Sequence, residues 1–310
     1  MVSFSVTFSN VLLSLLFLLP GFLLCRWGKV KPDHLSSISV ILLYVCGPCM
    51  FLDALTGLEP SAELNTQMGL FFLFSLAAQI LLMLLLLLVM GKQRRGEFRF
   101  RMLSIASVMG NVGFFGLPIV RALYPDVPEA AVYSCVFCAT LNILSWTVGI
   151  FTLTGEKKYI SLRQAFLNPT VLSIAIGIIL YLFRARNWLP ELLRTGVRTI
   201  SGMSTALCMM ILGIRLGAMK AKPLFTTPLV YLVALGKLVI FPLFSYLLVL
   251  PFPLPPVFKA SMLVLAATPC ASILLNLAEM HHNGQEFAAN CCLLTTLLSI
   301  LTIPLLSLLI

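Results

Sequence analysis

Long apolar stretches, separated by short polar connections, divide the whole sequence. Ten can be drawn, at 5–25, 36–57, 66–90, 101–123, 131–153, 167–183, 196–217, 227–249, 257–279 and 286–308. A helix that crosses the roughly 30 Å hydrocarbon core of a bilayer needs about 20 apolar residues, so ten spans would use most of a chain of 310 residues. The sequence therefore predicts an all-α polytopic membrane protein with ten transmembrane helices and no room for a separate soluble domain.

The charged residues and cysteines exclude two other classes. Only 10% of the residues are charged, against about a quarter in soluble domains. Nucleic-acid binders gather Lys and Arg on one solvated face, whereas here these residues lie between apolar stretches, so we expect no nucleic-acid partner despite a net charge of +10. The nine cysteines lie within or at the ends of apolar stretches. This placement is typical of thiols that pack as small hydrophobes and predicts no disulfide framework.

The distribution of positive charge predicts how the chain crosses the membrane. With Lys237 set aside as intramembrane, the loops after stretches one, three, five and seven hold 14 Lys and Arg residues, and those after stretches two, four, six and eight hold 6. Because cytoplasmic loops carry the excess of Lys and Arg, we expect both termini to face outside. The loop after stretch six departs from this rule, with Arg184, Arg186, Arg194 and Arg198.

The first stretch has a second interpretation, as a signal peptide. A signal peptide carries a basic region before its apolar core, whereas the nearest basic residues here follow the apolar run, at Arg26, Lys29 and Lys31. We therefore expect a retained first helix that is anchored on the cytoplasmic side.

An even number of spans with both termini on one side invites a search for an internal repeat, and two sets of five spans would be inverted relative to each other. Glu129-Ala-Ala131 aligns with Glu286-Phe-Ala288 at an offset of 157, and a second match, at an offset of 159, joins stretches two and seven. Their agreement in offset and order predicts two inverted five-helix repeats, 1–155 and 156–310.

Two stretches carry helix-breaking residues in mid-membrane. Stretch four contains Gly110-Asn-Val-Gly-Phe-Phe-Gly-Leu-Pro118, and stretch nine contains Thr268-Pro-Cys-Ala-Ser272. Proline removes a backbone donor, and glycine lowers helix stability by about 1 kcal/mol relative to alanine. Freed backbone groups are costly in hydrocarbon unless they face protein or water, so two equivalent breaks predict that the helices cross at a cavity. The alternative is a pair of proline kinks that only improve packing. The expected crossing residues are Gly110, Gly116, Pro118 and Pro269.

A crossing of this kind suits an anion. The half-helices that begin after the breaks would present free amide N–H groups and positive dipole ends toward a common point. A cation site would be expected to contain Asp or Glu, yet Asp53, the one carboxylate placed inside a span, lies near the outer end of stretch two. The expected substrate-binding residues at the crossing are Asn111, Val112, Gly113, Thr268 and Ser272.

Three further polar residues lie in the apolar stretches. Lys237 is ten residues into stretch eight, and an intramembrane charge is a functional hypothesis by default. It is a candidate for coupling, as a fixed positive charge or a proton site, and the alternative is a lysine that bonds to carbonyls freed by the breaks. Asn142 and Asn168 either contact the substrate or join helices by hydrogen bonds.

Other motifs carry no chemistry in this context. Cys46-Gly-Pro-Cys49 matches the thioredoxin tetrapeptide, but it lies within an apolar stretch, and a redox motif needs an exposed helix start in a βαβ unit. His281 and His282 are adjacent and are not spaced to share a helix face, so no zinc site follows. The sequence lacks the common hydrolase, metalloprotease and phosphate-loop signatures.

The break in stretch four, Asn168-Pro169 and the break in stretch nine together resemble the auxin efflux carrier family, specifically its prokaryotic members, over 5–308. The resemblance implies a bile-acid-symporter-like fold. Helices one, two, six and seven would form a scaffold and dimer surface, and helices three to five and eight to ten a moving transport unit.

The family's substrates are organic anions, with auxin in plants and small carboxylates such as malate or malonate in the bacterial members. Asn111, Asn142 and Asn168 match polar positions that line the plant carriers' substrate site. Two features differ from the plant pattern. The long cytosolic loop is absent, and Gln79 is the only polar residue near the middle of stretch three, where plant carriers place an acidic and basic pair. Auxin is therefore not the expected substrate.

Together these observations predict a secondary transporter of a small organic anion in the bacterial cytoplasmic membrane. It would work by an elevator-type alternating-access mechanism, as a homodimer, without a cofactor, and with proton or sodium coupling left open. A cation/proton or sodium-coupled antiporter of related fold is the alternative, and would need buried carboxylates beside the crossing. An intramembrane enzyme would need a catalytic constellation within the spans, and we expect no enzymatic activity.

Overall fold

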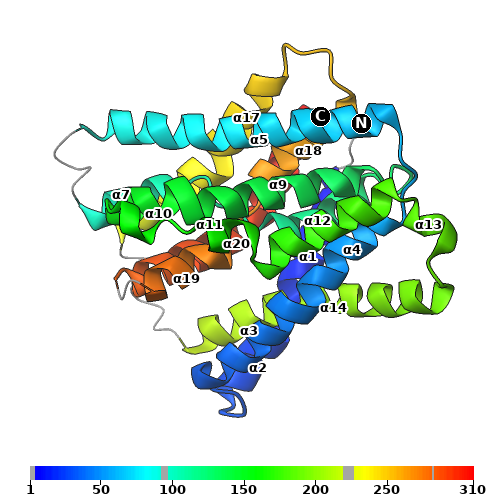
Figure 1. Cartoon of the computed structure of the whole chain (residues 1–310). Coiled ribbons are helices and arrows are strands. Elements are labelled where there is room, and N and C mark those ends of the chain that lie inside the picture. Colours follow the sequence, from blue (N-terminus) through cyan, green and yellow to red (C-terminus); the bar gives the residue numbers. More distant parts are fainter. Residues whose placement is uncertain (1–3, 92–96, 219–226, 281–282) are drawn as a thin grey trace.

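A computed structural model describes residues 4–91, 97–218, 227–280 and 283–310, and the regular elements in these ranges are all helices (Figure 1). Residues 92–96 of the loop after stretch three and the pair His281-His282 lie outside the described residues. The first half contains α1 (Phe4–Leu16), α2 (Leu18–Arg26), η1 (Pro32–His34), α3 (Leu35–Ile41), η2 (Leu42–Cys46), α4 (Gly47–Thr56), α5 (Ala62–Val89), α7 (Phe98–Ala106), η3 (Val112–Gly116), α8 (Leu117–Leu123), α9 (Ala130–Leu144), η4 (Ser145–Gly149) and α10 (Ile150–Thr154). The second half contains η5 (Lys157–Tyr159), α11 (Leu162–Phe166), α12 (Pro169–Leu182), α13 (Ala185–Trp188), α14 (Glu191–Ala218), α16 (Pro228–Leu235), η6 (Gly236–Ile240), α17 (Phe241–Val249), α18 (Pro256–Ala266), α19 (Ser272–Met280), α20 (Gln285–Leu306) and η7 (Ser307–Leu309).

Seven helical runs in the described ranges are long and apolar enough to cross a membrane. They correspond to predicted stretches one, two, three, five, seven, eight and ten, and comprise Phe4–Arg26, Pro32–Thr56, Ala62–Val89, Ala130–Thr154, Glu191–Ala218, Pro228–Val249 and Gln285–Leu309. The other three stretches contain shorter apolar helices, Val112–Leu123, Pro169–Leu182 and Pro256–Ala266. The chain is thus a polytopic helical membrane protein with at least seven candidate spans.

In the described ranges, single π-helical turns interrupt three of the long helices and a fourth begins the short helix Val112–Leu123, and proline explains three of the four. Pro48, Pro118 and Pro242 each lie in the first turn after a π turn, in α4, α8 and α17. Proline has no N–H for the carbonyl four residues earlier and clashes with it, and a π turn accommodates this loss within an otherwise continuous helix.

Helices α2 and α14 pack with their backbones in contact. A Cβ atom added to Gly21 would overlap the backbone oxygen of Met210, and one added to Gly213 would overlap the backbone oxygen of Leu18. Gly217 lies one turn further along, against Phe22. Small residues allow this close approach of helices in membranes. Helix α14 also packs against α4, and α4 against α12, so helices from stretches one, two, six and seven form one packed group.

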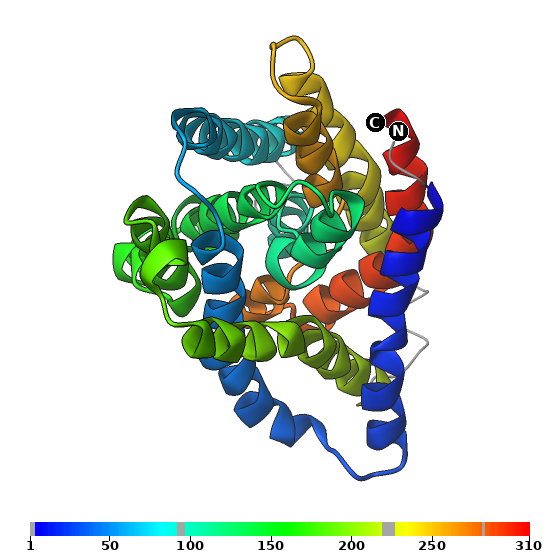
Figure 2. The ribbon, with the colours of Figure 1, turned by 90° about the vertical axis from the view of Figure 1, so that its right-hand side faces the viewer.

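The remaining long helices pack around an aromatic cluster. Phe71 of α5 stacks on Tyr133 of α9, with 4.6 Å between ring centroids, and meets Phe258 of α18 edge-on at 4.8 Å. Helix α17 packs against both α5 and α18, and α20 packs against α16 and α19. Figure 2 shows α1 beside α20 along one edge, in agreement with their contact, so the two groups also touch there. The interrupted segments from stretches four and nine lie inside this arrangement.

Candidate functional site

Both predicted breaks are confirmed. Helix α7 ends at Ala106 and the helix resumes at Val112, while α18 ends at Ala266 and α19 begins at Ser272. The two non-helical segments cross, and Gly110 pairs with Cys270 in an isolated antiparallel β-bridge. Pro269 lies within the unwound segment, whereas Pro118 lies in the first turn of α8, so Pro118 does not itself make the break.

Backbone groups at the crossing bond mainly to each other. The N–H of Asn111 donates to the carbonyl of Pro269 at 2.7 Å, and the N–H of Ala271 donates to the carbonyl of Met109 at 3.1 Å. The N–H of Val112 donates to the Gly110 carbonyl, and the N–H of Cys270 to the Thr295 hydroxyl. The expectation of free amides immediately after the breaks is therefore wrong for these residues, because pairing across the crossing satisfies them.

One side of the crossing is closed. Lys237 and Thr268 are fully buried there, and a Cβ on Gly110 would meet Thr268 Oγ1 and Lys237 Nζ. The ammonium of Lys237 donates to the carbonyl of Ala266 at 2.5 Å and lies 4.8 Å from the centroid of the Phe241 ring. Thr268, just beyond the end of α18, donates to the Leu265 carbonyl in the last turn of that helix. Lys237 thus makes the contact expected if it serves as a donor to the carbonyls freed by the helix breaks, the alternative to a role in coupling.

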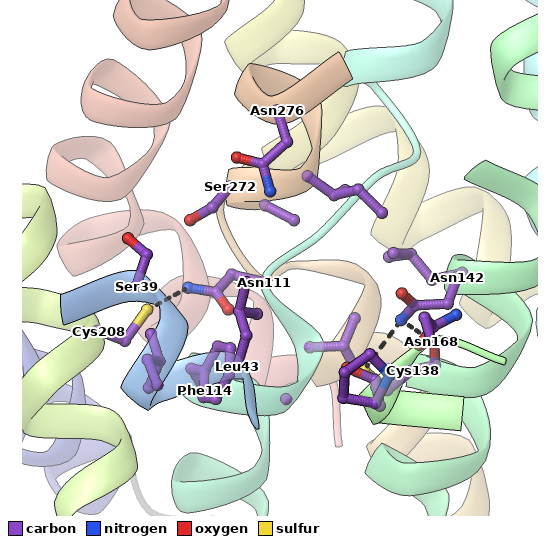
Figure 3. Close-up of a pocket in the computed structure, with 18 of the residues that line it drawn as sticks. Ser39, Leu43, Asn111, Phe114, Cys138, Asn142, Asn168, Cys208, Ser272 and Asn276 are labelled. Carbon is purple, nitrogen blue, oxygen red and sulfur yellow. Dashed lines mark hydrogen bonds between the residues drawn. The ribbon is translucent and has the colours of Figure 1, made fainter. Parts of the chain in front are cut away.

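The other side of the crossing is open to a cavity of about 400 Å³ (Figure 3). Both half-helix starts line it, from Gly110 to Phe114 and from Ala271 to Ile273. The Asn111 amide points across it to Cys208 of α14, with 3.7 Å between Nδ2 and Sγ, and Ser272 and Asn276 lie on the side of α19 that faces it. The polar or thiol side chains that line the cavity are Ser39, Tyr44, Asn111, Cys138, Asn142, Trp146, Gln164, Asn168, Thr170, Cys208, Arg215, Ser272 and Asn276.

Asn142 and Asn168 reach the cavity from the far side. The amide of Asn142 donates to the carbonyl of Cys138 one turn earlier, at 2.8 Å. Asn168 caps α12, because its side-chain oxygen accepts from the N–H of Val171 at 2.9 Å while its amide nitrogen donates to Gln164 and Ala165 carbonyls. These bonds stay within neighbouring turns, so they do not fit a role in joining distant helices.

The structure therefore brings most of the predicted site residues together. Gly110, Asn111, Val112, Gly113, Asn142, Asn168 and Ser272 line one cavity, while Thr268, Lys237, Gly116, Pro118 and Pro269 are not among its lining residues. Sequence reasoning missed Asn276 and Arg215. The available signals were the position of Asn276 one turn after Ser272, and that of Arg215 two turns after Cys208 on one helix face.

Two groups of ion pairs flank the site. Arg215 of α14 pairs with Glu279 of α19, with 3.3 Å between Nη1 and Oε1. On the other side, Asp53 of α4 accepts from Arg121 of α8 at 3.0 Å and lies 3.8 Å from Arg198 of α14. Asp53 is thus held by two arginines away from the cavity. Two of the arginines that depart from the charge rule are also matched by carboxylates, Arg198 by Asp53 and Arg194 by Glu191.

Comparisons with known proteins agree with this architecture. A family model described as membrane transport protein matches residues 6–307, nearly the whole chain. A protein of Methanocaldococcus jannaschii described as an uncharacterized transporter is 23% identical over 304 residues, which cover 95% of this chain and 96% of that relative.

Proposed function

This chain belongs to the membrane transport protein family, as its resemblance to the auxin efflux carriers implied, and we propose that it carries a small organic anion across the membrane by alternating access. The single observation that carries the proposal is the cavity at the crossing. Amide and hydroxyl side chains and one arginine line it, and no acidic side chain does among the lining residues that the structure describes.

The lining fits a carboxylate better than a metal cation or a proton. Amides, hydroxyls and a guanidinium donate hydrogen bonds, and bonds from charged donors to carboxylates are the strongest of these. The volume is that of a small-molecule site. Small carboxylates such as malate or malonate fit within the cavity and match its polarity.

For the whole molecule we propose ten membrane crossings arranged as two inverted repeats, with both termini outside. The three shorter apolar helices complete the crossings in this arrangement. The packed group of α2, α4, α12 and α14 would be the scaffold and the dimer surface, and the crossing with its surrounding helices would move past it in the cytoplasmic membrane.

The cavity would open toward the cytoplasm. Ser39, Gln164 and Arg215 line it and lie at the ends of stretches that the charge count places inside. Asp53 and its two arginines lie at the opposite, outer end. The structure would then be an inward-facing state, in which the Asp53 group closes the outer side.

A ligand screen tests the substrate class. Purified protein is melted in the presence of acetate, malonate, malate and succinate, with malonamide as an uncharged control and sodium chloride as a salt control. We expect carboxylate-dependent stabilisation of the folded state and counterflow of the same carboxylate in proteoliposomes. Stabilisation by sodium ions alone, with no response to any carboxylate, would favour the cation antiporter instead.

Thiol labelling tests the orientation. Single cysteines are introduced in the 91–99 loop of a version without the natural cysteines, and intact cells are treated with an impermeant thiol reagent. We expect protection until the cells are permeabilised, and a matched cysteine in the loop after stretch four to react at once. Labelling of the 91–99 loop in intact cells would invert the topology.

A further inference from the structure

Helices α14 and α19 face each other across the cavity with polar side chains one or two turns apart. On α14, Cys208, Ile211 and Arg215 line the cavity at spacings that keep one face of a helix. On α19, Ser272 and Asn276 do the same, and Glu279 continues that face toward the mouth. The two helices are thus lined up from the crossing, where Asn111 meets Cys208, to the mouth, where Arg215 meets Glu279.

Among the described residues that line this cavity, Arg215 is the only one with a positively charged side chain. It lies seven residues after Cys208, about 10 Å along the helix axis. Its guanidinium lies at the mouth, with 3.3 Å between Nη1 and Glu279 Oε1. Its side chain is 21% exposed, which leaves it both reachable and partly shielded from water.

We propose that Arg215 is the residue that binds the carboxylate of the transported anion, and that the anion does so by taking the place of Glu279. The inference rests on the proposed function. A guanidinium binds a carboxylate through two parallel N–H groups, and Glu279 already occupies this donor with the same chemical group. The pair is weak because Glu279 is 51% exposed, so a carboxylate held at the same time by Asn276 or Ser272 replaces it readily.

The exchange has a mechanical consequence. The Arg215–Glu279 pair joins a helix of the packed scaffold group to the half-helix that follows the crossing. When a substrate carboxylate occupies Arg215, this link is broken and α19 is released from α14. Substrate binding and the release of α19 then both follow when the substrate carboxylate displaces the Glu279 carboxylate from Arg215.

Affinity measurements on three variants test the assignment. Purified Arg215→Gln, Glu279→Gln and Arg194→Gln are titrated with malonate, malate and succinate, with malonamide as the uncharged control. Arg194 is the matched control, since it pairs with Glu191 three residues earlier on the surface of the same helix. We expect Arg215→Gln to weaken carboxylate binding about ten- to a hundredfold and Arg194→Gln to leave it unchanged. Glu279→Gln should strengthen it about two- to fivefold, because the competing carboxylate is gone.

The outcomes separate this assignment from the proposed function. If the unmodified protein responds to a carboxylate and Arg215→Gln binds it equally well, the assignment is wrong and the proposed function stands. If Glu279→Gln weakens binding as much as Arg215→Gln does, the pair only positions the two helices. A gain of affinity in Glu279→Gln cannot arise from misfolding. This variant therefore tests the assignment of Arg215 even if Arg215→Gln is unstable. Absence of any carboxylate response in the unmodified protein overturns the proposed function and the assignment with it.

Discussion

Helix α14 has two contact regions, one tightly packed against α2 and one that borders a cavity toward α19. Toward α2 it presents Gly213 and Gly217, and the two backbones touch with no space between them. Toward α19 it presents Cys208 and Arg215, and a cavity of about 400 Å³ separates the helices. The closed region gains from dispersion contacts and cannot change without separating the helices. The open region has polar contacts at its two ends, Asn111–Cys208 and Arg215–Glu279. One helix is therefore tightly packed on one face and lines a cavity on the other.

The largest effect is expected in the closed region. Gly213→Val places a branched side chain where the backbone of α2 already lies, and neither backbone can yield. We expect a loss of about 3 kcal/mol or more in stability, seen as failure to recover monodisperse protein or as a much lower melting temperature. A variant that folds and melts normally would show that α2 and α14 are not in backbone contact.

The second effect concerns the closed side of the crossing. Lys237→Met leaves the Ala266 carbonyl buried without its donor, at a cost of about 1–3 kcal/mol, and we expect a lower melting temperature and strongly reduced transport. Lys237→Arg separates two roles, since arginine keeps a fixed charge but does not release its proton. Normal transport by Lys237→Met across the pH range would remove the lysine from any role in coupling.

The third effect belongs to the open region. Asn111→Ala removes a cavity-lining amide while the backbone pairing at the crossing remains. We expect carboxylate binding to weaken about three- to tenfold, as for one lost hydrogen bond of about 1 kcal/mol, with little change in the melting temperature of the unliganded protein. If Asn111→Ala lost stability as much as ligand binding, the role of Asn111 would be to hold the fold together, as the contacts of the closed region do.

The smallest effect serves as the baseline for the other three. Gly202 lies on an exposed part of α14, and a Cβ there meets no atom within 4 Å. Gly202→Ala should therefore be neutral or stabilise the helix by up to about 1 kcal/mol, with transport unchanged. A clear loss of stability would point to a contact of this surface with a second subunit.

The sequence predicted the positions of the helices and the two breaks because these depend on local properties. The length of an apolar stretch shows whether a helix can cross the membrane, and glycine and proline, as at Gly110 and Pro269, disfavour a helix in any context. The antiparallel pairing of the broken segments could not be predicted in the same way, since it depends on which distant segment lies opposite. For this reason the amides of Asn111 and Ala271, expected to be free for an anion, are used within the protein.

Residue type alone also predicted only part of the cavity. Asn111, Asn142, Asn168 and Ser272 stand out as polar residues within apolar stretches, and all four line it. Thr268 has the same character but lies on the closed side, where it is fully buried and donates to the Leu265 carbonyl. The direction of its side chain depends on the path of the unwound segment, which residue type does not show. Arg215 counts among the charges at the end of stretch seven in the sequence, and its position at a helix end gives no sign of the cavity beside it.

The antiparallel pairing at the crossing has a consequence for how such a carrier can diverge during evolution. The two bonds use peptide groups, which every residue except proline can supply in full, so they constrain the length and direction of the chain rather than its side chains. Gly110 is an exception, because a Cβ there would meet Thr268 Oγ1 and Lys237 Nζ. Exchange of Asn111, Ser272 or Asn276 would therefore change the lining of the cavity without disturbing the crossing itself. The Methanocaldococcus jannaschii relative, at 23% identity, still aligns with 95% of this chain.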